Sequence, residues 1–224
     1  MNDADIEHFI SVLEEEAKKW ELPIVSHLAM ERQDPFLILI STLLSLRTKD
    51  EVTAEASERL FRLADNLTEM LTLPSEVISR AIYPVGFYRV KAETILNVCR
   101  ELISRFNSRV PGTIEELLTI KGVGRKTANL VITLGFNKDG ICVDTHVHRV
   151  SNRWGYVRTK TPEQTEFALR GKLPRKYWIN YNTLLVAFGR RICRPVYPLC
   201  NSCPLGNYCE KIGVAKKNIT KSRI

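Results

Sequence analysis

The 224-residue sequence lacks any apolar run as long as a membrane helix needs, about 18 residues. The most apolar stretch, around 36–46, is shorter than that, which excludes a transmembrane protein. The first residues, MNDADIEHF, are acidic and polar, so we expect no secretory signal. Low-complexity segments and internal repeats are also absent, and 44% of the residues are apolar. This composition excludes collagen-like and wholly disordered chains.

Segments that alternate apolar and polar residues, as half-buried strands do, are missing too. Apolar residues recur at helical spacing instead, for example along residues 6–20. Asp34 followed by Pro35 is typical of a helix start, with an N-cap and a first-turn proline. Capping-box spacing at 48–51 and at 113–116 predicts two further helix starts. The sequence therefore predicts an all-α protein.

Positive charge is in surplus. Lys and Arg number 33 and Asp and Glu number 25, so the net charge is +8 and the pI is about 9.2. Such a surplus favours a polyanionic partner. The length suffices for one large or two small domains with a sizeable core.

The segment EELLTIKGVGRKTANLV, residues 115–131, predicts a helix, a glycine hairpin and a second helix. Gly122 and Gly124 can take backbone angles closed to other residues, so the turn can be short. We expect unpaired amides there, with the charges of Lys121 and Arg125, to bind an anion such as a DNA phosphate. The alternative is an ordinary helix–helix corner with exposed lysines.

Lys126 begins the second helix, where the positive helix end and Arg125 disfavour an ammonium, so we expect a lowered pKa. A neutral amine can form a Schiff base, whereas a charged one would contact phosphate. Asp144 can be the N-cap of the next helix, but the chain between the two residues is also long enough to bring Asp144 back to Lys126. A ten-residue helix advances roughly 15 Å, and residues 136–143 can span up to roughly 26 Å. An amine, a carboxylate and a phosphate site together predict attack on a sugar carbon of DNA.

Four of the six cysteines fall within seventeen residues, in the pattern C-x6-C-x2-C-x5-C. They are Cys193, Cys200, Cys203 and Cys209. Without a secretory signal we expect no disulfides, so the set predicts a metal or iron–sulfur site. Thiolates suit both zinc and iron–sulfur clusters. Because only one short C-x2-C pair is present, the spacing favours a [4Fe–4S] cluster over zinc.

The segments KGVGRKTANLV and VDTHVHR resemble the helix–hairpin–helix DNA glycosylase family, most of all its endonuclease III branch. That family combines a glycine hairpin, here Gly122-Val123-Gly124, with a catalytic lysine and an aspartate at the spacing seen here, 144 − 126 = 18. The resemblance extends from Asp34 to Cys209 and implies a [4Fe–4S] cofactor on the four cysteines. It departs at Lys121, where the family usually has proline, so we expect a slightly looser turn.

The resemblance also implies that the enzyme flips a nucleotide out of the duplex and fills the gap with two loops. In SLRTKD, Arg47 stands where the family offers glutamine, so we expect a changed reading of the opposite base. In GFYRVKAE, Phe87 takes the place of the apolar wedge, unless it is an ordinary core aromatic. We expect the cluster loop to present Arg194 towards phosphates.

The implied fold has two helical domains with a DNA-binding cleft. Residues 28–136 form a continuous domain with the hairpin, and residues 1–27 plus 137–224 form the iron–sulfur domain. The partner is double-stranded DNA with damaged bases or AP sites, and we expect no membrane association. We expect a monomer in the cytoplasm, associated with the nucleoid.

The implied activity is that of a bifunctional DNA glycosylase/AP lyase acting on oxidised pyrimidines such as thymine glycol. Lys126 would attack C1′ and form a Schiff base, Asp144 would stabilise charge on the sugar, and β-elimination would cut the strand. One alternative is a mismatch-specific glycosylase of the same superfamily, in which tyrosine or serine replaces the lysine. Another is a non-catalytic DNA-binding protein whose cluster senses redox state.

Overall fold

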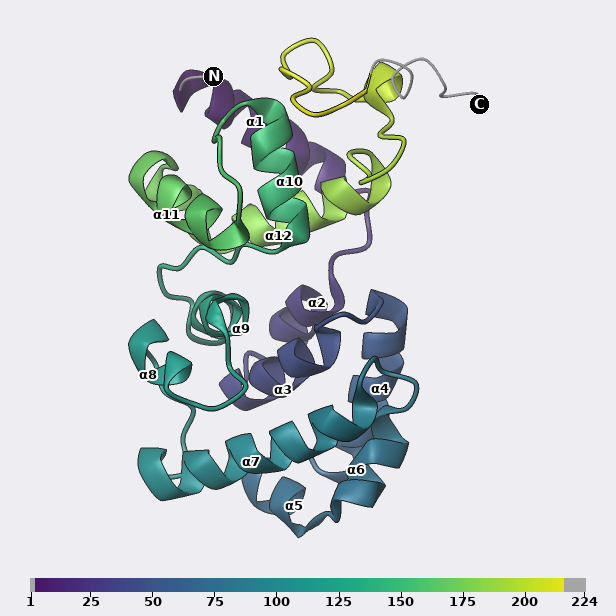
Figure 1. Ribbon diagram of the computed structural model, residues 1–224, viewed down its shortest axis with the longest axis vertical. Coiled ribbons are helices and arrows are strands. Elements are labelled where there is room, and N and C mark those ends of the chain that lie inside the picture. Colours follow the sequence, from purple (N-terminus) through teal and green to yellow (C-terminus); the bar gives the residue numbers. More distant parts are fainter. Residues whose placement is uncertain (1–2, 216–224) are drawn as a thin grey trace. The chain divides into compact units, whose positions relative to one another are not determined.

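The computed structural model describes residues 3–215, and over that range every regular element is a helix, as predicted (Figure 1). The chain divides into two compact units. One comprises residues 24–140, and the other comprises the residues up to 23 together with those from 141 onward. The domain limits predicted from the sequence lie at 28 and 136. No described helix is long and apolar enough to cross a membrane.

The unit of residues 24–140 is built from consecutive helices. They are α2 (Ile24–Glu31), α3 (Pro35–Ser45), α4 (Asp50–Leu63), α5 (Leu67–Thr72), α6 (Ser75–Ile82), α7 (Tyr88–Phe106), α8 (Ile114–Leu118), α9 (Arg125–Leu130) and a π-helical turn (Val131–Gly135). The second unit contains α1 (Asp3–Ala17), α10 (Thr145–Trp154), α11 (Pro162–Lys172), α12 (Trp178–Arg191) and two 3₁₀ turns, Arg175–Tyr177 and Cys200–Ser202.

Helix α3 forms the centre of the first unit, since every residue from Phe36 to Leu44 is buried. The predicted cap is confirmed: Asp34 Oδ1 accepts hydrogen bonds from the backbone N–H groups of Phe36, at 2.7 Å, and Leu37, at 3.4 Å. A helix that is apolar all round is buried all round. α3 contacts α2, α4, α7, α9 and the π-helical turn, so it supports the elements that carry the site.

The capping box at 113–116 is confirmed, because Thr113 Oγ1 accepts from the Glu116 N–H at 3.3 Å. The one at 48–51 is wrong. Helix α4 begins at Asp50, and its N-cap Lys49 makes no side-chain cap. Thr48 Oγ1 instead donates to Leu46 O at 3.3 Å and accepts from Gly86 N–H at 3.2 Å. The threonine joins two loops rather than starting a helix.

The second unit has a core of its own between α1, α10 and α12. Trp154 is fully buried there, with ring centroids 4.9 Å from Phe9 and 5.9 Å from Phe188. Leu205, from the cysteine-rich loop, is buried in the same core. The loop is therefore packed onto this unit by ordinary apolar contacts.

Candidate functional site: hairpin, lysine and cysteine loop

The hairpin needs glycine at one of its two glycine positions. Gly122 has φ +94°, and a Cβ there would lie 2.7 Å from Thr94 Cγ2 of α7, so no other residue fits. Gly124 has φ −96° and ψ 175°, which any residue adopts, so the expectation of a special backbone angle is wrong for it. A Cβ on Gly124 would meet nothing within 4 Å. Its lack of a side chain leaves room for a ligand to approach the backbone.

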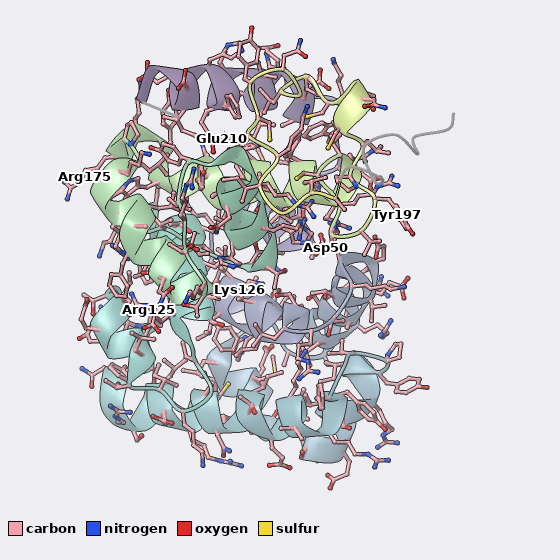
Figure 2. The ribbon with its side chains drawn as sticks, turned by 45° about the horizontal axis from the view of Figure 1, so that its top comes forward. Asp50, Arg125, Lys126, Arg175, Tyr197 and Glu210 are labelled. Carbon is pink, nitrogen blue, oxygen red and sulfur yellow. The ribbon has the colours of Figure 1, made fainter. Side chains whose placement is uncertain are left out.

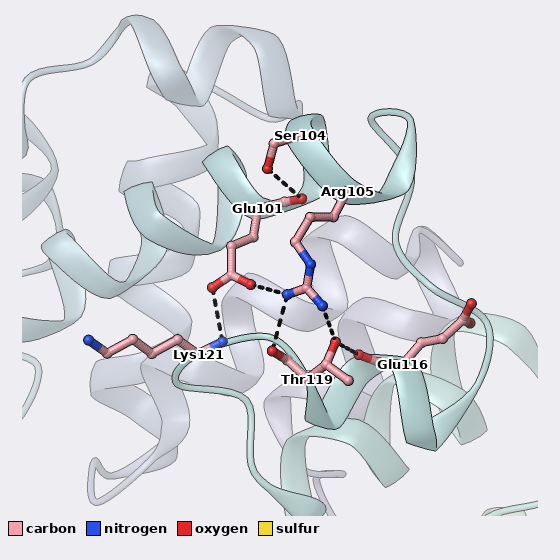
Figure 3. A network of polar contacts seen from close by, with 6 residues as sticks. All are labelled: Glu101, Ser104, Arg105, Glu116, Thr119 and Lys121. Carbon is pink, nitrogen blue, oxygen red and sulfur yellow. Dashed lines mark hydrogen bonds and ion pairs between the residues drawn. The ribbon is translucent and has the colours of Figure 1, made fainter.

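The hairpin is fastened to α7 by a polar network (Figure 3). Glu101 accepts the backbone N–H of Lys121 at 3.0 Å and pairs with Arg105 at 2.5 Å. Arg105 also donates to Thr119 Oγ1 at 2.8 Å. Proline has no N–H, so only a residue such as Lys121 can make the first bond. The turn is therefore tied down at Lys121, contrary to the expected loosening.

The hairpin leaves specific amides available for an anion. The N–H of Lys121 is used by Glu101, and that of Val123 donates to Ile120 O at 3.1 Å. The N–H groups of Gly122 and Gly124 have no hydrogen-bond partner among residues 3–215, and both residues are exposed. The hairpin therefore offers fewer unpaired amides to an anion than the sequence suggests.

Lys126 is the second residue of α9, directly after the hairpin, and it is half-buried. Figure 2 shows it beside Arg125 at the start of that helix. The residues that follow, Thr127 to Leu130, are buried, so the helix behind Lys126 is fixed in the core. This places an amine beside the exposed hairpin amides.

Lys91, which the sequence reasoning did not single out, organises the loops beside this site. It is 8% exposed, and its Nζ donates to Leu44 O at 2.7 Å, Leu46 O at 2.6 Å and Thr48 Oγ1 at 3.1 Å. Burial, and then the charge of Lys126, lower the pKa of Lys91 to about 8. At neutral pH the amine therefore keeps the proton that the third bond requires. The sequence pattern that could have identified Lys91 is a lysine on the otherwise apolar face of α7.

Replacing Lys91 with methionine should reduce the free energy of unfolding by about 1–3 kcal/mol, because two carbonyls and a hydroxyl lose their donor. Urea denaturation of the variant and the wild type measures the difference. Arg89→Met, on the exposed face of the same helix, should change it by less than about 0.5 kcal/mol. Equal stability of Lys91→Met and wild type would contradict the role assigned to these bonds.

Arg47 and Phe87 are brought together. The Cζ atom of Arg47 lies 4.9 Å from the centroid of the Phe87 ring, a cation–π contact. Both residues have left-handed backbones, with φ of 55° and 59°. Such strain in non-glycine residues concentrates at functional sites. Phe87 is 59% exposed, so it is not an ordinary core aromatic.

Asp144 lies in the other unit and is the N-cap of α10. Its Oδ1 accepts from the backbone N–H groups of His146, at 2.8 Å, and Val147, at 2.9 Å. Its Oδ2 has no hydrogen-bond partner in the described part of the chain. Asp144 therefore caps α10 with Oδ1, and its Oδ2 is available to accept a hydrogen bond from another group. Its pairing with Lys126 stays a prediction.

The four cysteines converge on one small pocket, whose other walls include Trp154, Phe188 and Leu199. Among residues 3–215, no three His, Cys, Asp or Glu side chains lie close enough together for a single metal ion. The sulfurs have donors nearby: Arg153 Nη1 donates to Cys193 Sγ at 3.5 Å, and Lys211 N–H to Cys209 Sγ at 3.3 Å.

The cysteine-rich loop is held to α10 mainly by Arg153, which also donates to Arg194 O at 2.5 Å and Pro195 O at 2.7 Å. Burial raises the pKa of the Cys203 thiol to about 12. Burial also raises the pKa values of the Cys200 and Cys209 thiols, so a positive group beside them would favour their ionised forms. Arg194 is exposed, and Figure 2 shows Tyr197 on the outside of the loop.

Comparisons with known proteins agree with this geometry. The family model described as HhH-GPD superfamily base excision DNA repair protein matches residues 40–175. Endonuclease III of Thermotoga maritima is 50% identical over 79% of this chain and 83% of its own length. A chloroplastic endonuclease III homologue of Arabidopsis thaliana is 42% identical, but the match spans 47% of its length. A solved endonuclease III–DNA trapped covalent intermediate superimposes with a TM-score of 0.84 at 31% identity, covering 94% of this chain and 97% of that one.

Proposed function

Since the chain belongs to the HhH-GPD superfamily of base excision DNA repair proteins, we propose that it is a DNA glycosylase and AP lyase for oxidised pyrimidines in double-stranded DNA. The observation that carries the proposal is Lys126, an amine placed directly after a hairpin with unpaired, exposed amides. The hairpin amides bind backbone phosphates, which carry no sequence information. The amine of Lys126 acts as the nucleophile.

The reaction proceeds through a Schiff base. The Nζ of Lys126 attacks C1′ of the damaged nucleotide, and the bond from C1′ to the base breaks with the electron pair leaving on the base. Loss of the amine proton and ring opening give an iminium at C1′. This iminium acidifies the proton on C2′, and its removal expels the 3′ phosphate by β-elimination. Water then hydrolyses the iminium and returns the lysine.

Lys126 also separates this proposal from the mismatch-specific alternative. Relatives with tyrosine or serine at that position can release a base but have no amine there to form an iminium. A lysine at this position favours the bifunctional reaction. The exposed Phe87 and Arg47 give the chain a pair of side chains that can fill the space of an extruded nucleotide.

The test is borohydride trapping on duplexes that contain an AP site or thymine glycol. Borohydride reduces an iminium to a stable amine, so the wild type should become covalently attached to both duplexes. An AP-site duplex without attached protein would remove the lyase assignment. Base release without attachment would indicate a monofunctional glycosylase, and attachment to the AP site alone would limit the proposal to the lyase step.

We also propose that Cys193, Cys200, Cys203 and Cys209 hold a [4Fe–4S] cluster. The four thiols line one pocket whose walls are otherwise largely apolar, and N–H donors face two of the sulfurs. A cubane is larger than one ion, so it suits sulfurs that do not close around a single metal. The cluster would act as a cross-link, and the reaction steps above do not use it.

Replacing Cys203 with serine should remove most of the iron and acid-labile sulfide from the purified protein and lower its melting temperature. Metal and sulfide analysis with visible absorbance measures the loss. Cys142→Ala, a buried cysteine outside the loop, should keep both. Zinc without sulfide in the wild type would contradict the cluster and leave the zinc alternative.

A further inference from the structure

We propose that Glu101 of α7 is a positioning residue for phosphate binding, because its carboxylate holds the hairpin in the shape that presents the Gly122 and Gly124 amides to DNA. This inference rests on the proposed function and assigns a further residue to its DNA-binding site. Lys121 stands where the family resemblance gives a proline, whose ring would restrict the backbone of the turn. In this chain a helix side chain supplies the restriction instead. Glu101 and the hairpin both belong to the unit of residues 24–140.

Two side chains of α7 hold residues 119–121, which lead into the hairpin (Figure 3). Glu101 and Arg105 lie one turn apart on the helix and pair through Glu101 Oε2 at 2.5 Å. Arg105 donates to Thr119 O at 3.2 Å and to Thr119 Oγ1 at 2.8 Å. The other carboxylate oxygen, Glu101 Oε1, accepts the Lys121 N–H at 3.0 Å. Because both side chains come from one helix, the path of the chain into the turn is fixed at each end of this short segment.

The bond to Glu101 acts on the torsion that a proline would restrict. Residues 120–123 form a turn that is closed by the Val123 N–H, which donates to Ile120 O at 3.1 Å. Gly122 is the third residue of this turn, and its φ of +94° has the sign that type II turns require there. The second residue of such a turn is commonly proline, which presets its own φ. Lys121 has no ring, so the hydrogen bond that orients its N–H sets this torsion from outside.

The charge of Glu101 opposes DNA binding, which makes its position informative. The N–H that Glu101 accepts belongs to the residue before Gly122, whose own amide is assigned to a phosphate. A negative group beside a phosphate site repels the ligand, and Arg105 offsets this repulsion by pairing with the carboxylate. The two roles therefore predict opposite signs. If Glu101 acts only through its charge, its removal strengthens DNA binding, whereas if it positions the hairpin, its removal weakens DNA binding.

Replacing Glu101 with alanine should weaken binding to a duplex that contains a tetrahydrofuran abasic analogue by about fivefold, although the variant carries one negative charge less. Glu101→Gln keeps an oxygen that can accept the Lys121 N–H, so its affinity should stay within about twofold of that of the wild type. Fluorescence anisotropy at fixed salt measures both affinities. Equal or tighter binding by Glu101→Ala would overturn the proposal, and so would equally weak binding by both variants.

Glu58→Ala is the matched control for the loss of a helical ion pair. Glu58 pairs with Arg62 one turn further along α4, in the same unit, and both side chains are exposed. This pair takes no part in the network that holds the hairpin (Figure 3). Its loss removes one negative charge without releasing the turn, so affinity for the abasic-analogue duplex should stay the same or rise slightly. An equal loss of affinity in Glu58→Ala and Glu101→Ala would reject the role assigned to Glu101.

A proline at position 121 provides a second test, because its ring can replace the restriction that Glu101 supplies. In the Glu101→Ala background, Lys121→Pro should bind the duplex about threefold more tightly than Lys121→Ala, and both double variants lack the lysine charge. In the wild-type background, the ring would take the place of the N–H that Glu101 accepts. Lys121→Pro should therefore bind no more tightly than Lys121→Ala there. A proline with the same effect in both backgrounds would refute the coupling between the two positions.

Catalysis separates this inference from the proposed function. Lys126 lies on α9, whose following residues are buried, so Glu101→Ala should cleave AP-site DNA at a saturating single-turnover rate within about twofold of the wild type. The protein concentration that gives half of that rate should rise with the loss of affinity. A saturating rate that falls as far as the affinity would reject a role confined to phosphate binding. If the wild type cleaves AP-site DNA and Glu101→Ala binds as tightly, this inference alone fails, whereas a wild type that does not cleave removes the proposed function itself.

Discussion

Replacing Lys126 with glutamine should abolish covalent trapping and slow strand cleavage at AP sites by at least about 10³-fold. The amide cannot form an iminium, so the β-elimination has no electron sink. Affinity for an abasic-analogue duplex should change by less than about fivefold, because the hairpin amides and the Arg47–Phe87 pair remain. Single-turnover cleavage and anisotropy measure the two quantities separately.

Lys138→Gln is the matched control for this variant. Lys138 donates to Gly112 O at 3.0 Å, away from the hairpin, and its loss should leave trapping unchanged. Trapping that persists in Lys126→Gln would mean that another amine is the nucleophile. Lys91 is unsuited to act as that nucleophile, because its amine is buried and donates hydrogen bonds to three acceptors.

Asp144 should show two separable roles. Asp144→Asn keeps an oxygen that can accept from His146 and Val147, so α10 keeps its cap and the unfolding free energy should fall by less than about 0.5 kcal/mol. The negative charge is lost, and base release should slow by about 10²-fold or more because the developing positive charge on the sugar is no longer stabilised.

Asp144→Ala removes both roles. It should slow base release to the same extent and also cost about 1 kcal/mol of stability, since the first N–H groups of α10 lose their acceptor. Chemical denaturation of both variants, beside single-turnover kinetics, distinguishes the roles. Full base release by Asp144→Asn would show that the carboxylate serves the helix alone.

The all-helical fold could be predicted because the signals are local. Asp34 before Pro35 and Thr113 before Glu116 cap helices through contacts between close neighbours, and the structure confirms both. The capping box predicted at Thr48 does not form, because the Thr48 hydroxyl accepts hydrogen bonds from Gly86 and Lys91 instead. Both residues lie about forty positions away in the sequence. The sequence pattern cannot show such a competitor.

The site was predictable in its residue types but less so in its connections. The hairpin, Lys126 and the four cysteines stand out by spacing. The bond from Lys121 N–H to Glu101 does not, because it joins a turn to a helix twenty residues earlier. Nor does the requirement at Gly122, which depends on the approach of Thr94 as well as on φ. Long-range packing decided these features.

Helix α10 carries Asp144 at its first end and Arg153 near its last. Arg153 contacts the cysteine-rich loop at Cys193, Arg194 and Pro195. Its roughly 15 Å length therefore sets a fixed spacing between the carboxylate and the loop. Because α10 is one rigid helix, a displacement of the cysteine-rich loop would be passed on to Asp144, and under the proposed function the assembly of the cluster and the placement of the carboxylate would then depend on each other.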